Sequence, residues 1–80
     1  MKATLYPSTA AALTINIKSF SDIQKLVGGY VAVAGCTKDG DILVNEEGIT
    51  LKLPRNNHFP HLFGDVVVAP AEWENIPYSN

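Results

Sequence analysis

The sequence predicts an α+β fold, in which an antiparallel sheet of five or six strands packs against one short helix at about residues 20–28. Three observations support this prediction. Residues 13–18 alternate apolar and polar side chains, which is the period-two pattern of a half-buried strand. Residues 20–27 instead have the apolar spacing of one helical face, with Phe20, Ile23, Leu26 and Val27. The other apolar segments are short and separated by turns rich in Gly and Asp, as strands joined by tight turns are.

The first element is a strand at residues 2–6, where Ala3 and Leu5 share one face and Pro7 ends the pattern. A connection of small residues follows at 8–11. The next strand, at residues 13–18, has the clearest alternation in the chain, with Leu13, Ile15 and Ile17 expected to face the core.

The helix has start and stop signals at both ends. Ser19 and Ser21 are candidate N-caps, and Asp22 lies where a carboxylate favours the positive end of the helix dipole. Gly28 is expected to end the helix in a left-handed cap, and Gly29 leads directly into the next strand.

The segments after the helix predict a meander. Residues 30–34 are expected to form a buried strand, and Lys38-Asp39-Gly40 carries an Asp-Gly hairpin signal before a partner strand at residues 42–44. The motif Asn45-Glu46-Glu47-Gly48 predicts a second tight turn. The chain then returns in a third strand at residues 49–53.

The remaining chain is expected to contain one long irregular stretch and one more strand. Residues 54–63 form the irregular stretch, and residues 65–69 form an apolar strand between Gly64 and Pro70. We expect a single domain over residues 1–80, with its compact part at about 2–69 and a C-terminal tail at 70–80 that begins with a helical turn.

Composition and charge restrict the partners. The formal net charge is −2, and residues 41–80 hold six carboxylates against two cations. The chain has no cluster of Lys and Arg that would bind nucleic acid, so direct nucleic-acid binding is not expected. The acidic second half is either a solvated surface or a surface that mimics DNA or meets a basic partner. Charged residues make up only 18% of the chain, which favours a protein partner or self-association into a homo-oligomer.

The single cysteine, Cys36, excludes an internal disulfide and a multi-thiolate metal site. The first residues alternate polar and apolar side chains instead of running apolar, so we expect neither a signal peptide nor a membrane anchor. We therefore expect a cytoplasmic protein with no membrane contact.

Four motifs occur in a fixed order: Val27-Gly28-Gly29-Tyr30, Asn45-Glu46-Glu47-Gly48, Leu53-Pro54-Arg55-Asn56 and Gly64-Asp65-Val66-Val67-Val68. With the hairpin between the first two, this order resembles the family named domain of unknown function 3846, over roughly residues 2–69. The resemblance implies a small protein of a bacteriophage or mobile element and supplies no catalytic residues. The sequence departs from the family pattern after Asn56, because His58-Phe59-Pro60-His61 replaces a segment of small residues.

Residues with catalytic or metal-binding chemistry have simpler structural explanations. Gly28-Gly29 follows a helix and lacks the lysine of a P-loop, so a helix cap is favoured over a phosphate site. Glu46 and Glu47 are adjacent in a turn and are expected to point apart. Cys36 has no histidine placed beside it.

His58 and His61 are spaced for metal binding on a helix, with Asp65 or Glu46 as a third ligand, but Pro60 lies between them. Surface histidines are therefore favoured over a zinc site. We expect no enzyme activity, no metal and no cofactor.

Two groups of residues remain as binding candidates. The first is the loop run Arg55, Asn56, Asn57, His58 and Phe59, which mixes charge, amides and an aromatic on a long loop. The second is Trp73 and Tyr78, which lie in the acidic tail.

The leading hypothesis is a non-catalytic binding protein of a phage or mobile element that occupies a host protein surface, with counter-defence as a candidate role. The alternative is an oligomeric binder that sequesters a small ligand or nucleotide signal. It would use Arg55, Asn56 and Asn57 as polar contacts and Tyr30 or Phe59 as stacking surfaces. A third hypothesis, a metal-dependent hydrolase, requires a metal at His58 and His61.

Overall fold

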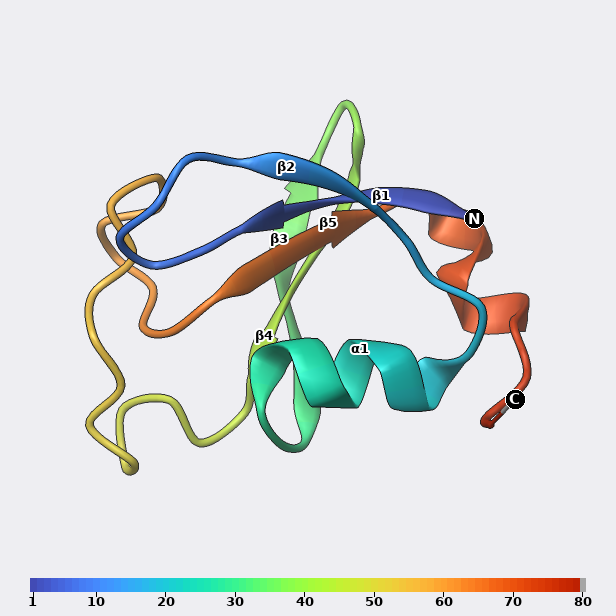
Figure 1. Ribbon diagram of the computed structural model, residues 1–80. Helices are drawn as coiled ribbons and strands as arrows, with labels where there is room; N and C mark the ends of the chain where they lie inside the picture. Colours follow the sequence, from blue (N-terminus) through green and yellow to red (C-terminus); the bar gives the residue numbers. More distant parts are fainter. Residues whose placement is uncertain (80) are drawn as a thin grey trace.

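The computed structural model describes residues 1–79 and has five strands and one α-helix in two layers (Figure 1). The elements are β1 Lys2–Tyr6, β2 Leu13–Asn16, α1 Phe20–Val27, β3 Val31–Thr37, β4 Gly40–Asn45, β5 Val66–Ala69 and the 3₁₀ helix η1 Ala71–Asn75. The predicted α+β class, with one short helix on an antiparallel sheet, is confirmed.

The last strand of the chain is the central strand of the sheet. The strand order is β2-β1-β5-β4-β3, and every neighbouring pair is antiparallel. Val68 of β5 is paired with Thr4 of β1 on one side and with Ile42 of β4 on the other. All four residues of β5 are buried, because this strand has a neighbour on each side and is covered on both faces.

Apolar side chains cover both faces of the sheet. On one face α1 contributes Ile23 and Val27 to a core with Leu43 and Val67, and the tail adds Trp73. On the opposite face the core consists of Ile42, Val44, Val66 and Val68. The long loop before β5 covers this second face with Phe59 and Leu62, so the sheet lies between a helix and a loop.

The helix ends follow the sequence signals. Ser19 is the N-cap and forms a capping box with Asp22. Gly28 is in the left-handed conformation, with φ 82°, and its N–H donates to the Gln24 carbonyl at 2.8 Å.

Two predicted strand features are wrong, and both follow from the order of the strands in the sheet. Residues 49–53 form no strand: Leu51 N donates to the Glu47 carbonyl at 2.8 Å, and the segment coils in turns with Leu51 exposed. β4 already pairs with β3 and β5, so neither of its sides can accept a third strand. β3 is longer than expected and mostly exposed, because it lies at the edge of the sheet.

The predicted burial of the strand at residues 13–18 is also only partly correct. β2 ends at Asn16 and Leu13 is 47% exposed, whereas Ile17 is fully buried after the strand has ended. The alternation therefore identifies the strand but overstates the burial of an edge strand.

The tail after β5 packs on the body of the protein. Phe20 N, at the start of α1, donates to the Pro77 carbonyl at 2.8 Å, and Ser21 N donates to the Tyr78 carbonyl at the same distance. The carbonyl groups of the tail thus accept hydrogen bonds from backbone N–H groups in the first turn of α1, which have no partner within the helix. Within residues 1–79 there is no helix with the length and apolar character needed to cross a membrane.

Candidate binding surface

Asn56 anchors the long loop before β5. Its side chain is fully buried, and Nδ2 donates to the carbonyl oxygens of Tyr6 at 2.9 Å and Gly64 at 3.0 Å. Oδ1 accepts from the backbone N–H groups of His58 at 2.8 Å and Phe59 at 3.0 Å. Both amide hydrogens and the carbonyl oxygen are therefore used inside the protein, and the side chain has no group to offer a ligand.

Asn45 makes an equivalent connection at the end of α1. Its Nδ2 donates to the Val27 carbonyl at 3.1 Å, and its Oδ1 accepts from Glu47 N at 2.7 Å. A Cβ on Gly29 would stand 3.0 Å from Asn45 Nδ2, so the second glycine makes room for this amide. The four motifs thus fit together in two pairs, one through Asn45 and one through Asn56 and Gly64.

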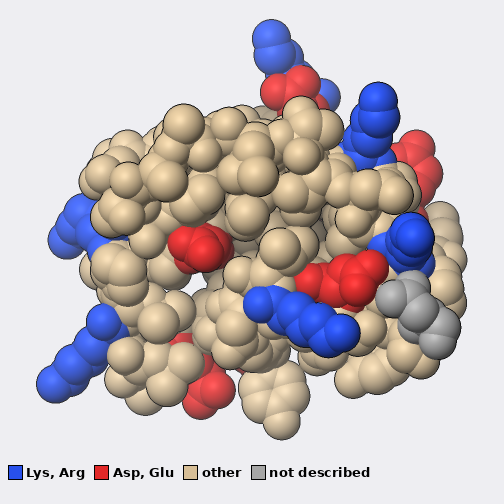
Figure 2. Space-filling view, viewed as in Figure 1, with Lys and Arg blue, Asp and Glu red and all other residues tan. Residues whose placement is uncertain are grey.

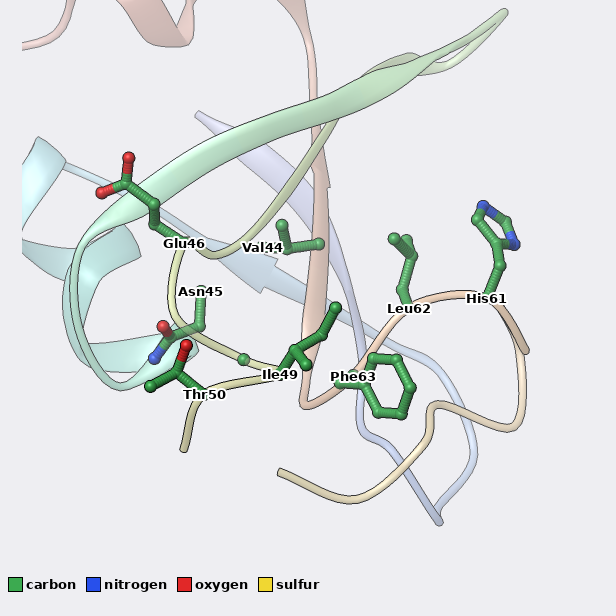
Figure 3. Close-up of a pocket in the computed structure, with 9 residues that line it drawn as sticks. Val44, Asn45, Glu46, Ile49, Thr50, His61, Leu62 and Phe63 are labelled. Carbon is green, nitrogen blue, oxygen red and sulfur yellow. The ribbon is translucent and has the colours of Figure 1, made fainter. Parts of the chain in front are cut away.

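An open pocket of about 470 Å³ lies between the turn after β4 and the segment before β5 (Figure 3). Its apolar lining consists of Val44, Ile49, Leu62 and Phe63. Glu46 and His61 also line the pocket, and Figure 3 shows them on opposite sides of the apolar side chains. The pocket therefore has an apolar centre, with a carboxylate side chain on one side and an imidazole side chain on the other.

Gly48 permits the close approach that forms this pocket. A Cβ at this position would stand 2.9 Å from the Phe63 carbonyl oxygen. The neighbouring residue, Ile49, is 76% exposed even though it lines the pocket, and Leu51 is 53% exposed. Apolar surface is therefore exposed at the pocket itself, through Ile49, and also two residues further along the chain, at Leu51.

A second groove, of about 500 Å³, lies between β2 and α1 and is lined by Lys18, Asp22 and Lys25 as well as apolar residues. Two backbone donors to the carboxylate, first Lys18 N at 2.9 Å and also Ser19 N, together with the charge of Lys25, lower the pKa of Asp22 against the opposing effect of burial. Asp22 is thus engaged in the helix cap.

The structure does not combine the predicted loop residues into one site. The Arg55 guanidinium lies 5.1 Å from the Phe63 ring centroid and donates to the Pro60 carbonyl. Asn57 is exposed, and its backbone N–H donates to the Ser8 carbonyl at 2.8 Å. Arg55 is thus held within the loop, and the backbone of Asn57 is held by the connection between β1 and β2, while the Asn57 side chain stays exposed.

The aromatic residues of the loop pack on β1. His58 and Phe59 make edge contacts with the Tyr6 ring, at centroid distances of 5.2 Å and 5.1 Å, and His58 Nε2 lies 2.6 Å from the Ala10 carbonyl oxygen. His61 lies apart from this contact, in the pocket. Among residues 1–79 no group of three His, Cys, Asp or Glu side chains is arranged to hold a metal ion.

The predicted tail residues lie together on the other side of the protein. Trp73 is half-buried and stacks on Phe20 at a centroid distance of 6.3 Å. Tyr78 is 66% exposed, lies 5.8 Å from the same ring and donates from its hydroxyl to Gln24 at 3.3 Å. Tyr78 is thus available to a partner, whereas Trp73 mainly holds the tail.

Sequence reasoning missed Ile49, Leu62 and Phe63 as candidate binding residues, and considered His61 as a metal ligand and as the end of the candidate loop. Ile49 begins the strand predicted at residues 49–53, and the pocket joins segments that no local pattern connects. No local sequence signal identifies Ile49, because residues 49–53 alternate as a strand does although they form none. Figure 2 shows charges of both signs scattered over the face that it displays, without a basic patch.

Comparisons with known proteins gave one match. A family model described as Domain of unknown function (DUF3846) matches residues 1–78. Neither the curated proteins nor the solved structures contain a match.

Proposed function

The chain belongs to the DUF3846 family, and we propose that it is a non-catalytic protein-binding module whose contact surface is the pocket beside Ile49. The observation that carries this proposal is that Ile49, a large apolar side chain in the lining of an apolar pocket, is itself 76% exposed to solvent. A side chain of a partner protein fills the pocket, and the partner's surrounding surface covers the exposed Ile49.

The dimensions fit this form of binding. A volume of about 470 Å³ lies in the range of natural small-molecule pockets and accepts one bulky apolar side chain with room for its backbone. Protein interfaces place their strongest contacts in this way, as an aromatic or apolar anchor in a pocket with a polar rim. Glu46 gives the rim a negative charge, so an anchor flanked by a basic residue is favoured.

The partner that we propose is a host protein, and the setting is the cytoplasm of a cell that carries a phage or mobile element. This part of the proposal is supported by the origin that the family resemblance implies. Counter-defence is the role that we propose within that setting.

The alternative of a nucleotide-signal binder receives less support from the geometry. Asn56 is committed to internal hydrogen bonds, and Phe59 packs against Tyr6. Among residues 1–79 nothing in the arrangement of His58 and His61 favours the metal-dependent hydrolase.

The decisive experiment compares two surface variants in capture from a lysate of the host cell. Ile49→Lys places a charge at the mouth of the pocket, and Leu13→Lys places the same charge at an exposed apolar residue of β2 as a matched control. We expect the wild type and Leu13→Lys to retain a stoichiometric partner and Ile49→Lys to lose it. Equal capture by all three proteins, or no stoichiometric partner, would contradict the proposal.

A direct probe of the pocket complements the capture. N-acetyl-tryptophanamide, titrated into labelled protein, is expected to shift the NMR signals of Ile49, Leu62 and Phe63 and to leave Leu13 unchanged. A panel of nucleotides that raises the melting temperature instead would favour the ligand-binding alternative.

A further inference from the structure

Within residues 1–79 no segment pairs with the outer edge of β3, and the strand itself contains no charged residue. β3 spans Val31–Thr37, is bonded only to β4 and is exposed from Val33 onward. Natural edge strands are blunted by charge, proline, bulges or short length, because an open edge pairs readily with another strand. β3 has a bulge between Val33 and Gly35, but it is seven residues long and contains neither charge nor proline.

Backbone groups of β3 are available at this edge. Tyr30 O accepts from Glu46 N at 2.8 Å, so the backbone of Tyr30 is directed toward the β4 side. In an antiparallel ladder successive residues alternate in direction, and the N–H and C=O groups of Val31 and Val33 are therefore directed away from β4. These groups can hydrogen-bond to another extended strand without any change in the sheet.

We propose that β3 pairs with β3 of a second copy of this chain, antiparallel and about a two-fold axis, to form a continuous sheet across a homodimer. Self-pairing opposes no like charges, because the ten residues from Gly28 to Thr37 are uncharged. A two-fold interface uses the same patch on both copies, and an antiparallel ladder satisfies this condition.

Charges at the two ends of β3 are complementary in this arrangement. Lys38 follows one end of the strand, and Glu46 lies beside Tyr30 at the other end, and both are exposed. Antiparallel pairing brings Lys38 of each copy toward Glu46 of the other. Asp39 does not oppose this contact, because it lies over β1 and β2 with Lys2 and Thr14.

The other edge of the sheet is less suited to pairing. β2 has only four residues, Leu13–Asn16, and Lys18 follows it closely. A short edge strand with a nearby lysine has two of the features that prevent strand addition. The self-association is therefore assigned to β3.

The test is sedimentation equilibrium of the intact protein from micromolar to millimolar concentration. We expect a monomer–dimer equilibrium that Val33→Lys abolishes and that the same change on β2, Leu13→Lys, leaves unchanged. Hydrogen exchange at the Val31 and Val33 amides is expected to slow as the dimer forms. A wild type that stays monomeric, or a dimer disrupted by Leu13→Lys and not by Val33→Lys, would overturn the proposal.

A charge exchange tests the orientation without altering β3. Lys38→Glu is expected to raise the dimer dissociation constant about tenfold, since two symmetric exposed pairs become repulsive. The double variant Lys38→Glu with Glu46→Lys is expected to restore it. If the double variant is no tighter than Lys38→Glu alone, the antiparallel pairing is wrong.

Discussion

The indole Nε1 of Trp73 donates to Oδ2 of Asp41 at 2.8 Å and so connects the C-terminal tail to the start of β4. The contact joins η1 to β4, the strand that forms a hairpin with the edge strand β3. It adds a directional hydrogen bond to a tail otherwise held by stacking on Phe20 and by two backbone bonds to α1.

Trp73→Phe should separate the hydrogen bond from the stacking. The smaller ring keeps its contact with Phe20 but leaves Asp41 without its donor. We expect a loss of about 1 kcal/mol in the free energy of unfolding, since the pair is only partly buried. Urea denaturation measures this loss, and Trp73→Ala should cost more because the stacking is also removed. Equal stabilities of wild type and Trp73→Phe would show that the hydrogen bond contributes nothing.

Asn56→Ala should be strongly destabilising. The substitution removes two donors and one acceptor and leaves the carbonyls of Tyr6 and Gly64 without this partner. We expect a loss of about 3 kcal/mol or more. Asn57→Ala is the matched control, because the adjacent amide is exposed, and it should change stability by less than about 0.5 kcal/mol. A tolerant Asn56→Ala would mean that the loop is held by its aromatic contacts alone.

Gly40→Ala should be far more costly than Gly35→Ala. Both glycines have positive φ, 140° and 145°, so both substitutions strain the backbone. A Cβ at Gly40 would also stand 2.0 Å from the Ala69 carbonyl oxygen, whereas one at Gly35 meets nothing nearer than 3.9 Å. We expect about 1–2 kcal/mol for Gly35→Ala and several kcal/mol for Gly40→Ala in thermal or urea unfolding. Similar losses would show that β5 moves to accommodate the methyl group.

Asp22 should make the stability depend on pH in the acid range. Its pKa is lowered in the folded protein, chiefly by the hydrogen bond from Lys18 N. The folded state therefore binds this proton less readily than the unfolded chain, in which the pKa is about 3.9. The stabilisation is present above the unfolded value and is lost as the pH falls through the lower folded value.

Asp22→Asn is the corresponding variant, because it keeps the size of the side chain and removes the titration. We expect it to be less stable than the wild type at neutral pH and to approach the wild type as the solution becomes acidic. NMR titration of the Asp22 carboxyl should give a midpoint below that of an unstructured aspartate. A normal midpoint, or a stability difference that does not change with pH, would contradict this account.

The features predicted correctly from the sequence depend on neighbouring residues. Ser19, Asp22 and Gly28 specify the helix ends by their own hydrogen bonds and backbone preferences, and the Asp39-Gly40 turn specifies the β3–β4 hairpin. The features predicted wrongly depend on distant ones. Residues 49–53 have a strand-like pattern, but the place beside β4 is taken by β5, which begins at Val66.

In the candidate site, too, the features set by neighbouring residues could be predicted and those set by distant residues could not. The composition of the residue 55–59 loop predicts a binding role, but it does not reveal the internal hydrogen bonds of Asn56, because the partners Tyr6 and Gly64 lie outside the loop. The pocket between Gly48 and Phe63 depends on a close backbone approach that no residue pattern encodes.

The central position of β5 has a consequence for how the chain folds. The β1–β2 hairpin and the β3–β4 hairpin form from nearby residues, but Figure 1 shows that β5 lies between them. The two hairpins therefore cannot join into one sheet until the ribosome has released Val66–Ala69. Closing contacts over such separations is slow compared with hairpin formation. The protein should thus acquire its structure in one late cooperative step, with two apolar hairpins exposed until then.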